Sequence, residues 1–215
     1  QYLDGEFYPA FVEDGNYMIR ARVSYEVGDP VIDSPKQHEA FDEKNITVEG
    51  TASPTTKIQL LNNDVEMGST IVGEDGTFSI PATLTTGENK LVAVSTLDGK
   101  LTGKSSLITA IHITEEPKIE QITPSENQYV LPGEKVKVSV KTNVLHGDVN
   151  FEVKFPTQQT GQLFSGNKMV EVEPGIYEGS WTVPGNIDLQ NVSVGITVTD
   201  LLGNQTTKEA EGKLM

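Results

Sequence analysis

The sequence predicts an all-β fold, with tandem Ig-like β-sandwiches preceded by a β-hairpin. Short segments in which apolar and polar residues alternate recur along the chain, with turn signals about every ten residues between them. A turn followed by an aromatic-led strand occurs three times, which indicates one supersecondary unit used repeatedly. No segment has a convincing helical apolar period, and the nearest helical candidate, residues 207–215, has too few apolar residues to dock well.

The repeated signature is an acidic residue, a tight turn ending in Gly, and an aromatic that opens a strand. Its copies lie at residues 13–17, 74–78 and 173–177. Asp-Gly and Pro-Gly supply the backbone angles that tight turns require. The aromatic suits the first residues of a half-buried strand. We therefore expect each copy to mark the start of a strand.

The composition limits the classes of partner. The 215 residues suit one large domain or two ordinary ones. The formal net charge of −15 argues against binding to nucleic acid or an anionic membrane, because both would repel this surface. No apolar run approaches the roughly 20 residues of a membrane helix, and without a basic start followed by an apolar core no signal peptide is expected in these residues. The absence of cysteine fits an extracellular bacterial β-module, and the start at Gln1 suggests a fragment of a larger protein.

Residues 1–28 are expected to form a β-hairpin. Residues 6–8 and 17–25 are its two strands, and the second alternates apolar with polar residues. A lone hairpin is marginal in water, so it must pair with another module or belong to a domain whose other strands lie elsewhere. The sequence leaves open whether it is a remnant of another domain or part of the next unit.

Two Ig-like β-sandwiches are expected at residues 30–114 and 117–215, joined by a short linker at residues 115–117. In the first, strands are expected at residues 45–50, 57–61, 70–72, 78–80, 90–95 and 106–113, with a turn at 62–64. In the second, they are expected at residues 119–122, 134–141, 151–155, 177–183 and 192–198. Trp181, the single tryptophan, is expected to fill the centre of the second core.

Four segments resemble known extracellular modules. Residues 86–91, Thr-Gly-Glu-Asn-Lys-Leu, resemble a turn and strand of bacterial Ig-like repeats, and residues 198–204 resemble the closing strand of such repeats. Residues 171–183, with Pro-Gly-Ile-Tyr and Trp-Thr-Val-Pro, are similar to Ig-like modules of secreted Gram-positive subtilisin-like serine proteases. Residues 4–17 resemble the end of the fibronectin type III-like domain in that group, so residues 1–28 would be the end of such a domain.

The resemblance implies a non-catalytic C-terminal accessory region of a secreted serine protease, whose catalytic domain lies outside this chain. The implied partners are that catalytic domain and a protein substrate or the cell wall, and the chain is expected to be extracellular and monomeric. The alternative is an adhesion module that binds the cell wall or a glycan independently of any protease. Tyr2, Phe7, Tyr8 and Phe11 would pack the first hairpin onto its neighbour or form a sticky surface for a protein partner.

No residue is predicted to be catalytic. A serine triad needs a His close to an activated Ser, with a carboxylate behind the His. His38, His112 and His146 lie in an acidic linker-like stretch, a strand and a Gly-Asp turn, and none has a Gly-x-Ser-x-Gly partner. Exposed or strand-face positions are expected for all three. Without cysteine or paired histidines, zinc is not expected either.

Calcium is the one metal that the sequence leaves open, because it takes only oxygen ligands. Residues 62–68 carry alternating oxygen side chains but do not match an EF-hand loop, because Gly falls one place late. Asp14 near Asp4 and Glu6, and Asp200 at a strand end, could also gather around an ion. Turn chemistry explains each of these residues without a metal. No cofactor is therefore predicted, with a structural calcium ion as the alternative.

We predict that calcium leaves the thermal stability of the chain unchanged. A ligand that binds only the native state raises the unfolding midpoint by mass action, whereas residues that only shape turns give no such rise. Thermal unfolding in excess calcium and in chelator measures the difference. A clear rise of the midpoint with calcium would make the acidic clusters a binding site and contradict the prediction.

Overall fold

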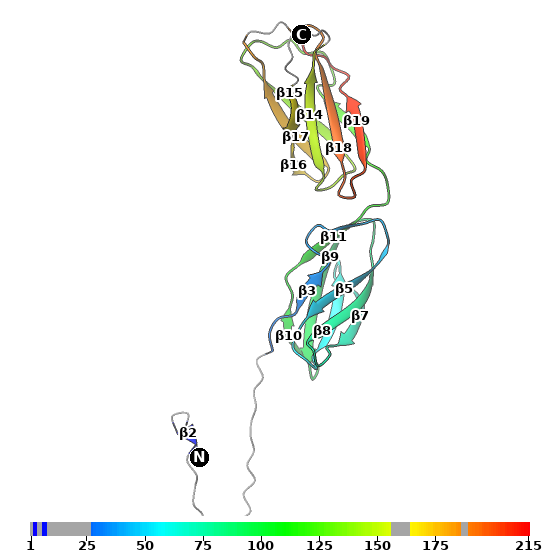
Figure 1. Cartoon of the computed structure of the whole chain (residues 1–215), viewed down its shortest axis with the longest axis vertical. Helices are drawn as coiled ribbons and strands as arrows, with labels where there is room; N and C mark the ends of the chain where they lie inside the picture. Colours follow the sequence, from blue (N-terminus) through cyan, green and yellow to red (C-terminus); the bar gives the residue numbers. More distant parts are fainter. Residues whose placement is uncertain (1, 4–5, 8–26, 156–163, 186–188) are drawn as a thin grey trace, which may run out of the picture.

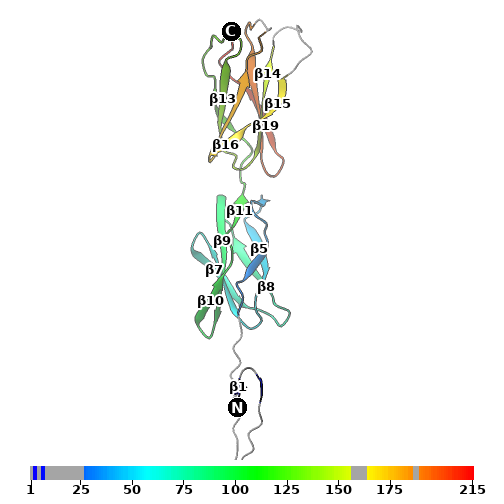
Figure 2. The same cartoon turned by 90° about the vertical axis from the view of Figure 1, so that its left-hand side faces the viewer.

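The computed structural model describes residues 2–3, 6–7, 27–155, 164–185 and 189–215. Within these ranges every regular element is a β-strand, so the all-β prediction is confirmed. The described residues contain no helix with the length and apolar character needed to cross a membrane. Two β-sandwiches lie end to end along the long axis of the molecule (Figure 1), and a view turned by 90° shows the same arrangement (Figure 2).

The first sandwich consists of two sheets. One has the order β3-β5-β8, formed by β3 (Val31–Ser34), β5 (Asn45–Thr51) and β8 (Thr77–Thr83). The other has the order β4-β11-β9-β6-β7, with β10 also paired to β9. Its strands are β4 (Ala40–Phe41), β6 (Lys57–Asn62), β7 (Val65–Ile71), β9 (Gly87–Leu97), β10 (Lys100–Lys104) and β11 (Ile108–His112).

The second sandwich also consists of two sheets, with the orders β12-β13-β17-β16 and β15-β14-β18-β19. The first contains β12 (Ile119–Thr123), β13 (Lys135–Thr142), β16 (Val170–Glu173) and β17 (Ile176–Thr182). The second contains β14 (Asp148–Lys154), β15 (Phe164–Lys168), β18 (Ser193–Thr199) and β19 (Gln205–Glu209). All the neighbouring strands within these two sheets run antiparallel.

Each sandwich buries its own apolar faces. In the first, Val48 on β5 lies opposite Ile80 on β8, and both side chains are buried. In the second, Val136 on β13 lies opposite Trp181, which is 6% exposed and belongs to the core cluster, as predicted. The two hydrophobic clusters have no member in common, which follows from apolar residues that alternate along strands of two separate pairs of sheets.

The described copies of the turn signature occupy equivalent places in the two sandwiches. Gly76 and Gly175 have φ angles of 78° and 73°, a backbone conformation that favours glycine. Phe78 on β8 and Tyr177 on β17 follow them and are buried. The two strands pair antiparallel with β5 and β13, each the second strand in the spatial order of its sheet. The third copy, residues 13–17, lies outside the described residues.

Two predicted strands of the first sandwich are wrong in extent. The strand expected at residues 70–72 begins at Val65, because Asn63 and Asp64, with φ of 49° and 65°, form a two-residue hairpin turn directly after β6. The strand expected at residues 106–113 is β11, which is shorter at both ends. β10 was not predicted, and between β10 and β11 the Ser105 hydroxyl oxygen accepts a hydrogen bond from the Ala93 N–H at 2.9 Å.

The expectation for the C-terminal residues is also wrong. Residues 205–209 form β19, an edge strand, and Leu214 beyond it is fully buried in the second core. Leu214 makes bridges to Gln128 and Val192, which close the far end of the sandwich. A single buried leucine outside any alternating segment gives no periodic signal, so the sequence did not indicate it. Strands β3, β4 and β15 were not predicted either.

The first segment is described only in part. β1 (Tyr2–Leu3) pairs antiparallel with β2 (Glu6–Phe7), a pairing that was not predicted. That expected strand lies outside the described residues, as do Tyr8, Phe11 and most of the predicted hairpin. The domain limits 1–28, 30–114 and 117–215 remain predictions.

Asn89 gives the Gly-Glu-Asn segment a structural role. It is fully buried, and its Oδ1 accepts hydrogen bonds from the Thr85 N–H and from Nδ2 of Asn62, both at 2.8 Å. Its Nδ2 donates to the carbonyl oxygens of Thr85 at 2.7 Å and Gly87 at 2.9 Å. The amide thus pairs backbone groups of Thr85, in the turn before β9, and of Gly87, at the start of β9. Buried backbone groups need such partners.

We predict that Asn89→Ala lowers the stability of the first sandwich by about 3 kcal/mol, because it leaves the buried Asn62 amide and three part-buried backbone groups without this partner. Asn45→Ala is the matched control: Asn45 is exposed and accepts only a surface bond from the Thr83 hydroxyl at 3.1 Å, so it should cost below about 0.5 kcal/mol. Circular dichroism follows both sandwiches. Trp181 fluorescence follows the second alone, and its transition should not move in Asn89→Ala. Equal effects of the two substitutions would contradict the prediction.

Candidate functional site

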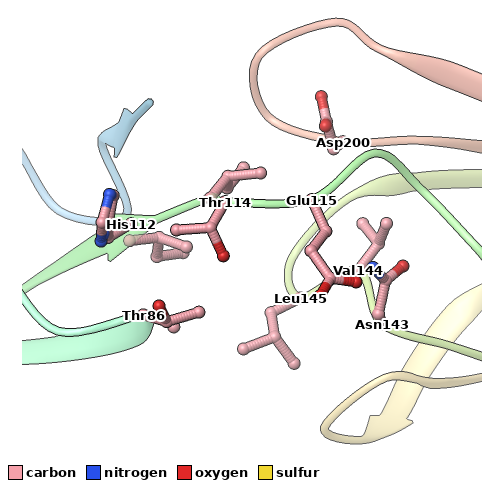
Figure 3. Close-up of a pocket in the computed structure, with 11 residues that line it drawn as sticks. Thr86, His112, Thr114, Glu115, Asn143, Val144, Leu145 and Asp200 are labelled. Atoms are coloured by element: carbon pink, nitrogen blue, oxygen red, sulfur yellow. The ribbon is translucent and has the colours of Figure 1, made fainter. Parts of the chain in front are cut away.

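The joint between the two sandwiches gathers polar contacts from both of them. The first sandwich contributes the start of β9, the end of β11 and the segment before β4. The second contributes the loop between β13 and β14, residues 143–147, and the ends of β16 and β18. Figure 3 shows Thr86, His112 and Thr114 on one side of this region and Asn143, Val144, Leu145 and Asp200 on the other.

The linker and the residue after it, Lys118, are hydrogen-bonded to the second sandwich. Oδ1 of Asn143 accepts a hydrogen bond from the Lys118 N–H at 2.7 Å, and Nδ2 of Asn143 donates to the Glu116 carbonyl oxygen at 3.1 Å. The Thr142 hydroxyl donates to the Lys118 carbonyl oxygen at 2.7 Å. The Lys118 ammonium also pairs with the Glu115 carboxylate, and this hydrogen bond lowers the pKa of Glu115. These contacts fix the path of the chain from the linker into β12.

His146 contacts both sandwiches. Its Nε2 lies 3.0 Å from Oε1 of Glu88 on β9, and its Nδ1 lies 3.3 Å from Oε2 of Glu171 on β16. The same Glu171 oxygen accepts the His146 backbone N–H at 2.9 Å. The imidazole also stacks on His38 of the first sandwich, with ring centroids 4.1 Å apart and an interplanar angle of 12°. The hydrogen bond and ion pair to Glu88 and the ring contact with His38 thus all join the two sandwiches through His146.

The elements around His146 hold it in place. His146 has a φ of 54°, in the left-handed region that histidine, asparagine and aspartate adopt more readily than most residues. The Tyr177 hydroxyl accepts a hydrogen bond from the Gly147 N–H at 2.9 Å and donates to the Val144 carbonyl oxygen at 3.2 Å. Oε1 of Glu171 accepts the Gly175 N–H at 2.9 Å. The signature turn and the loop of His146 are therefore held by the same carboxylate.

Tyr177 is almost fully buried, and this burial raises the pKa of its phenol to about 12. Hydrogen bonding from the Gly147 N–H opposes the rise, while the nearby Glu171 carboxylate adds to it. The phenol is therefore neutral at physiological pH and can donate to the Val144 carbonyl. It acts as a fixed support for the 143–147 loop and not as an acid or base.

A cavity of about 180 Å³ lies beside these contacts, between the two sandwiches. Apolar side chains from both sandwiches and a few polar groups line it, among them Ile111, His112, Glu115, Val144, Leu145 and Asp200. His112 is buried, and its Nδ1 has no hydrogen-bond partner among the described residues. Asp200 is occupied by its own turn, since Oδ1 accepts the N–H groups of Leu202 and Asn204. The cavity is a gap in the joint with room for a few water molecules.

The structure places the residues considered for chemistry as follows. His112 lies in β11, as expected, but on a buried face, whereas His38 and His146 stack on each other. Among the described residues, none of the three histidines is hydrogen-bonded to a serine hydroxyl. The stacked rings and the two carboxylates can hold two surfaces together, but they do not form a nucleophile and base.

The calcium candidates are explained by turns where the structure describes them. Asn62 belongs to the buried Asn89 network, Asn63 and Asp64 form the β6–β7 turn, and Asp200 holds the β18–β19 turn. No three His, Asp or Glu residues of the described ranges form a group suited to a metal ion. Asp4 and Asp14 lie outside the described residues, and only the backbone of Glu6 is described.

The contacts of His146 at the joint were not predicted from the sequence. Glu88 and His146 are 58 residues apart, and each lies in a segment whose local chemistry has another explanation. The Gly-Asp after His146 did indicate a turn, and that turn exposes the ring. Nothing local indicated which surface the ring would meet, because that depends on how the linker directs the second sandwich.

Comparison with known proteins gives one distant relative. No family model matches the sequence. Bacillopeptidase F of Bacillus subtilis (strain 168) is 27% identical over an alignment of 301 residues, which covers 100% of this chain and 21% of that protein. The chain thus spans about a fifth of the relative that it matches. This similarity over the whole chain confirms the resemblance to subtilisin-like proteases that the motifs indicated, at the level of distant similarity.

Solved structures similar to the chain consist of Ig-like or fibronectin type III-like modules. Fibronectin(III)-like modules of Clostridium thermocellum CbhA are 26% identical, covering 40% of this chain and 97% of that chain, with a TM-score of 0.34. A chimeric titin Z1Z2 is 15% identical, covering 90% of this chain and 99% of that chain, with a TM-score of 0.34. A tetra-tandem repeat of a large adhesion protein is 16% identical, covering 87% and 49%, with a TM-score of 0.42.

We predict that Tyr177→Phe removes a pH dependence of stability above pH 10. The unfolded phenol loses its proton near pH 10, whereas the buried one keeps it to about pH 12, so ionisation favours the unfolded state between these values. The free energy of unfolding should fall by about 1 kcal/mol between pH 10 and 11 from this group. Tyr177→Phe should be destabilised at neutral pH by about 2 kcal/mol, since the Gly147 N–H and Val144 carbonyl lose their partner.

Denaturant unfolding at several pH values, followed by Trp181 fluorescence, measures both effects. Tyr129→Phe is the matched control, because Tyr129 is 85% exposed and should change neither quantity. Equal alkaline slopes in the native chain and in Tyr177→Phe would contradict the assignment.

Proposed function

We propose that this chain is a non-catalytic accessory region of an extracellular subtilisin-like serine protease. In that role the two sandwiches act as a spacer that positions the catalytic domain relative to a protein substrate or the cell wall. The observation that carries the proposal is the similarity of the whole chain to one part, 21%, of bacillopeptidase F. The catalytic domain of the parent protein is then the principal partner of the chain, which is otherwise a monomer.

The geometry of the joint supports a spacer. A spacer transmits position only if its modules do not swing freely, and linkers between modules are often flexible. Here the linker is hydrogen-bonded to Asn143 and Thr142, and His146 connects the second sandwich to Glu88 of the first. The sandwiches lie end to end, which gives the longest reach for their size (Figure 2).

The surface charge supports positioning over direct adhesion to an anionic polymer. The chain has 31 acidic and 16 basic residues, and exposed like charges repel an anionic surface over about one Debye length. A spacer with this surface stays hydrated and resists collapse onto such a polymer. The same charge keeps the modules soluble and apart from one another.

A second candidate function is an adhesion module that binds the cell wall or a glycan without any protease. One observation favours it: Tyr129 is 85% exposed and Leu131 73% exposed at the end of the second sandwich that carries the C-terminal residue Met215. An exposed aromatic side chain can stack on a sugar or on a protein surface. Binding of the chain to purified cell wall, lost in Tyr129→Ala, would support this function, and a flat titration would count against it.

We predict that, in the native producer, these sequences belong to a polypeptide that also contains a serine protease domain. Mass spectrometry of the secreted proteins, separated by size before digestion, tests this directly. Peptides of this chain and of a protease domain should co-migrate at a mass well above that of the chain alone, 23.4 kDa. A mature protein that contains these peptides and no protease domain would contradict the proposed function.

An activity measurement on the isolated chain tests whether it has protease activity of its own. The purified 215-residue chain should not cleave casein, because all catalysis is assigned to the parent's protease domain. Cleavage by the chain alone, abolished by a serine-protease inhibitor, would show that it is itself an enzyme.

A further inference from the structure

We propose that the joint between the sandwiches is stiffened by acid through protonation of His146. In this inference the imidazolium of His146 bridges Glu88 of the first sandwich and Glu171 of the second. The neutral ring can serve only one of them as a donor. The inference concerns this chain alone and does not depend on the protease assignment.

Protonation changes the number of N–H groups that the His146 imidazole can offer to the two carboxylates. Nε2 of His146 is hydrogen-bonded to Oε1 of Glu88 at 3.0 Å, whereas Nδ1 lies 3.3 Å from Oε2 of Glu171, at ion-pair distance but without hydrogen-bond geometry. A neutral imidazole has one N–H and one lone pair, whereas an imidazolium has two N–H groups and a positive charge. Only the imidazolium can donate to Glu88 and at the same time form an ion pair with Glu171. In the neutral ring, one carboxylate faces a lone pair.

Protonation of His146 also changes the electrostatic interaction between the Glu88 and Glu171 carboxylates. Glu88 and Glu171 come from opposite sandwiches and are separated by the width of one imidazole, in a chain with a net charge of −15. Without a cation between them, these like charges weaken the contact of the two sandwiches. Protonation of His146 places a positive charge between them and replaces the repulsion with a charge-assisted hydrogen bond to Glu88 and an ion pair with Glu171.

The other titratable groups around His146 set the range of pH. His38 stacks on the ring at a centroid distance of 4.1 Å, and a second proton on His38 would repel the first. Tyr177 lies beneath the loop and is neutral, with a pKa of about 12. Asp148 at the end of the loop is paired with Lys168 at 3.2 Å. Glu115 in the linker is paired with Lys118. These last two pairs do not compete for His146.

The bridge is expected in the pH range in which a histidine is ordinarily protonated and carboxylates are ordinarily ionised. Histidine is the side chain that ordinarily changes charge between pH 5 and 8, and carboxylates ordinarily protonate below about pH 5. The bridge is therefore complete in mildly acidic solution. The ion pair with Glu171 needs the protonated ring, and both contacts need ionised carboxylates. The sandwiches themselves stay folded throughout, because their cores contain neither Glu88 nor Glu171.

Spin labels on the full chain measure the stiffness of the joint. The chain has no cysteine, so Thr47→Cys in the first sandwich and Lys208→Cys in the second, both exposed, introduce two unique labelling sites. Double electron–electron resonance spectroscopy gives the distribution of distances between the two spin labels. At about pH 5.5 we expect one narrow distribution; at about pH 8 the fraction outside it should rise about fivefold, the effect of losing a partly exposed ion pair worth about 1 kcal/mol.

Three variants complete the test. His146→Asn keeps a residue that tolerates the left-handed backbone but cannot titrate, and it should give the broad distribution at both pH values. Glu88→Gln removes the charge on the first sandwich alone, with no change in the 143–147 loop, and should also lose the response. Glu173→Gln, the matched control on an exposed carboxylate of β16, should keep it. A native chain with equal widths at both pH values, or a response that survives in His146→Asn or in Glu88→Gln, would overturn the inference.

Discussion

The contacts of His146 with Glu88 and Glu171 are the constraint on which the arrangement of the two sandwiches depends. Each sandwich buries its own hydrophobic cluster, so neither needs the other in order to bury apolar surface. Their relative position therefore depends on the linker and on a small polar contact. Such an interface is easily modified, because a few hydrogen bonds of about 1 kcal/mol each decide between a stiff and a loose joint. This is the physical reason that one ring can matter for a chain of 215 residues.

The joint is connected to the turns that define each sandwich. Glu171 accepts the Gly175 N–H of the signature turn with one oxygen and contacts His146 with the other. Glu88 is next to Asn89, whose buried amide holds the turn before β9. The residues that shape the local fold and those that align the modules are thus neighbours in the chain. A substitution in either turn is expected to alter alignment as well as stability.

Much of the fold could be predicted from the sequence. Alternating segments such as residues 192–198 and the Gly-containing turns at 74–78 and 173–177 gave strands and turns because their chemistry is local. The edge strand β7 was placed too late, since its exposed residues show no alternation, and Leu214 was missed as a single apolar residue with no period around it. The joint could not be predicted, because the rings of His38 and His146 meet only through the path of the linker. Similarity to part of bacillopeptidase F supports a function for the chain that its side chains alone did not indicate.

Backbone residual dipolar couplings of the full chain in mildly acidic solution test the central claim most directly. They report the orientation and the averaging of each sandwich independently of any label or substitution. If the polar contacts at His146 hold the modules, the couplings of residues 31–112 and 119–214 should fit one alignment tensor with the orientation of the structure. Two tensors of clearly different magnitude would show that the sandwiches move independently, and the account of the joint would then be wrong.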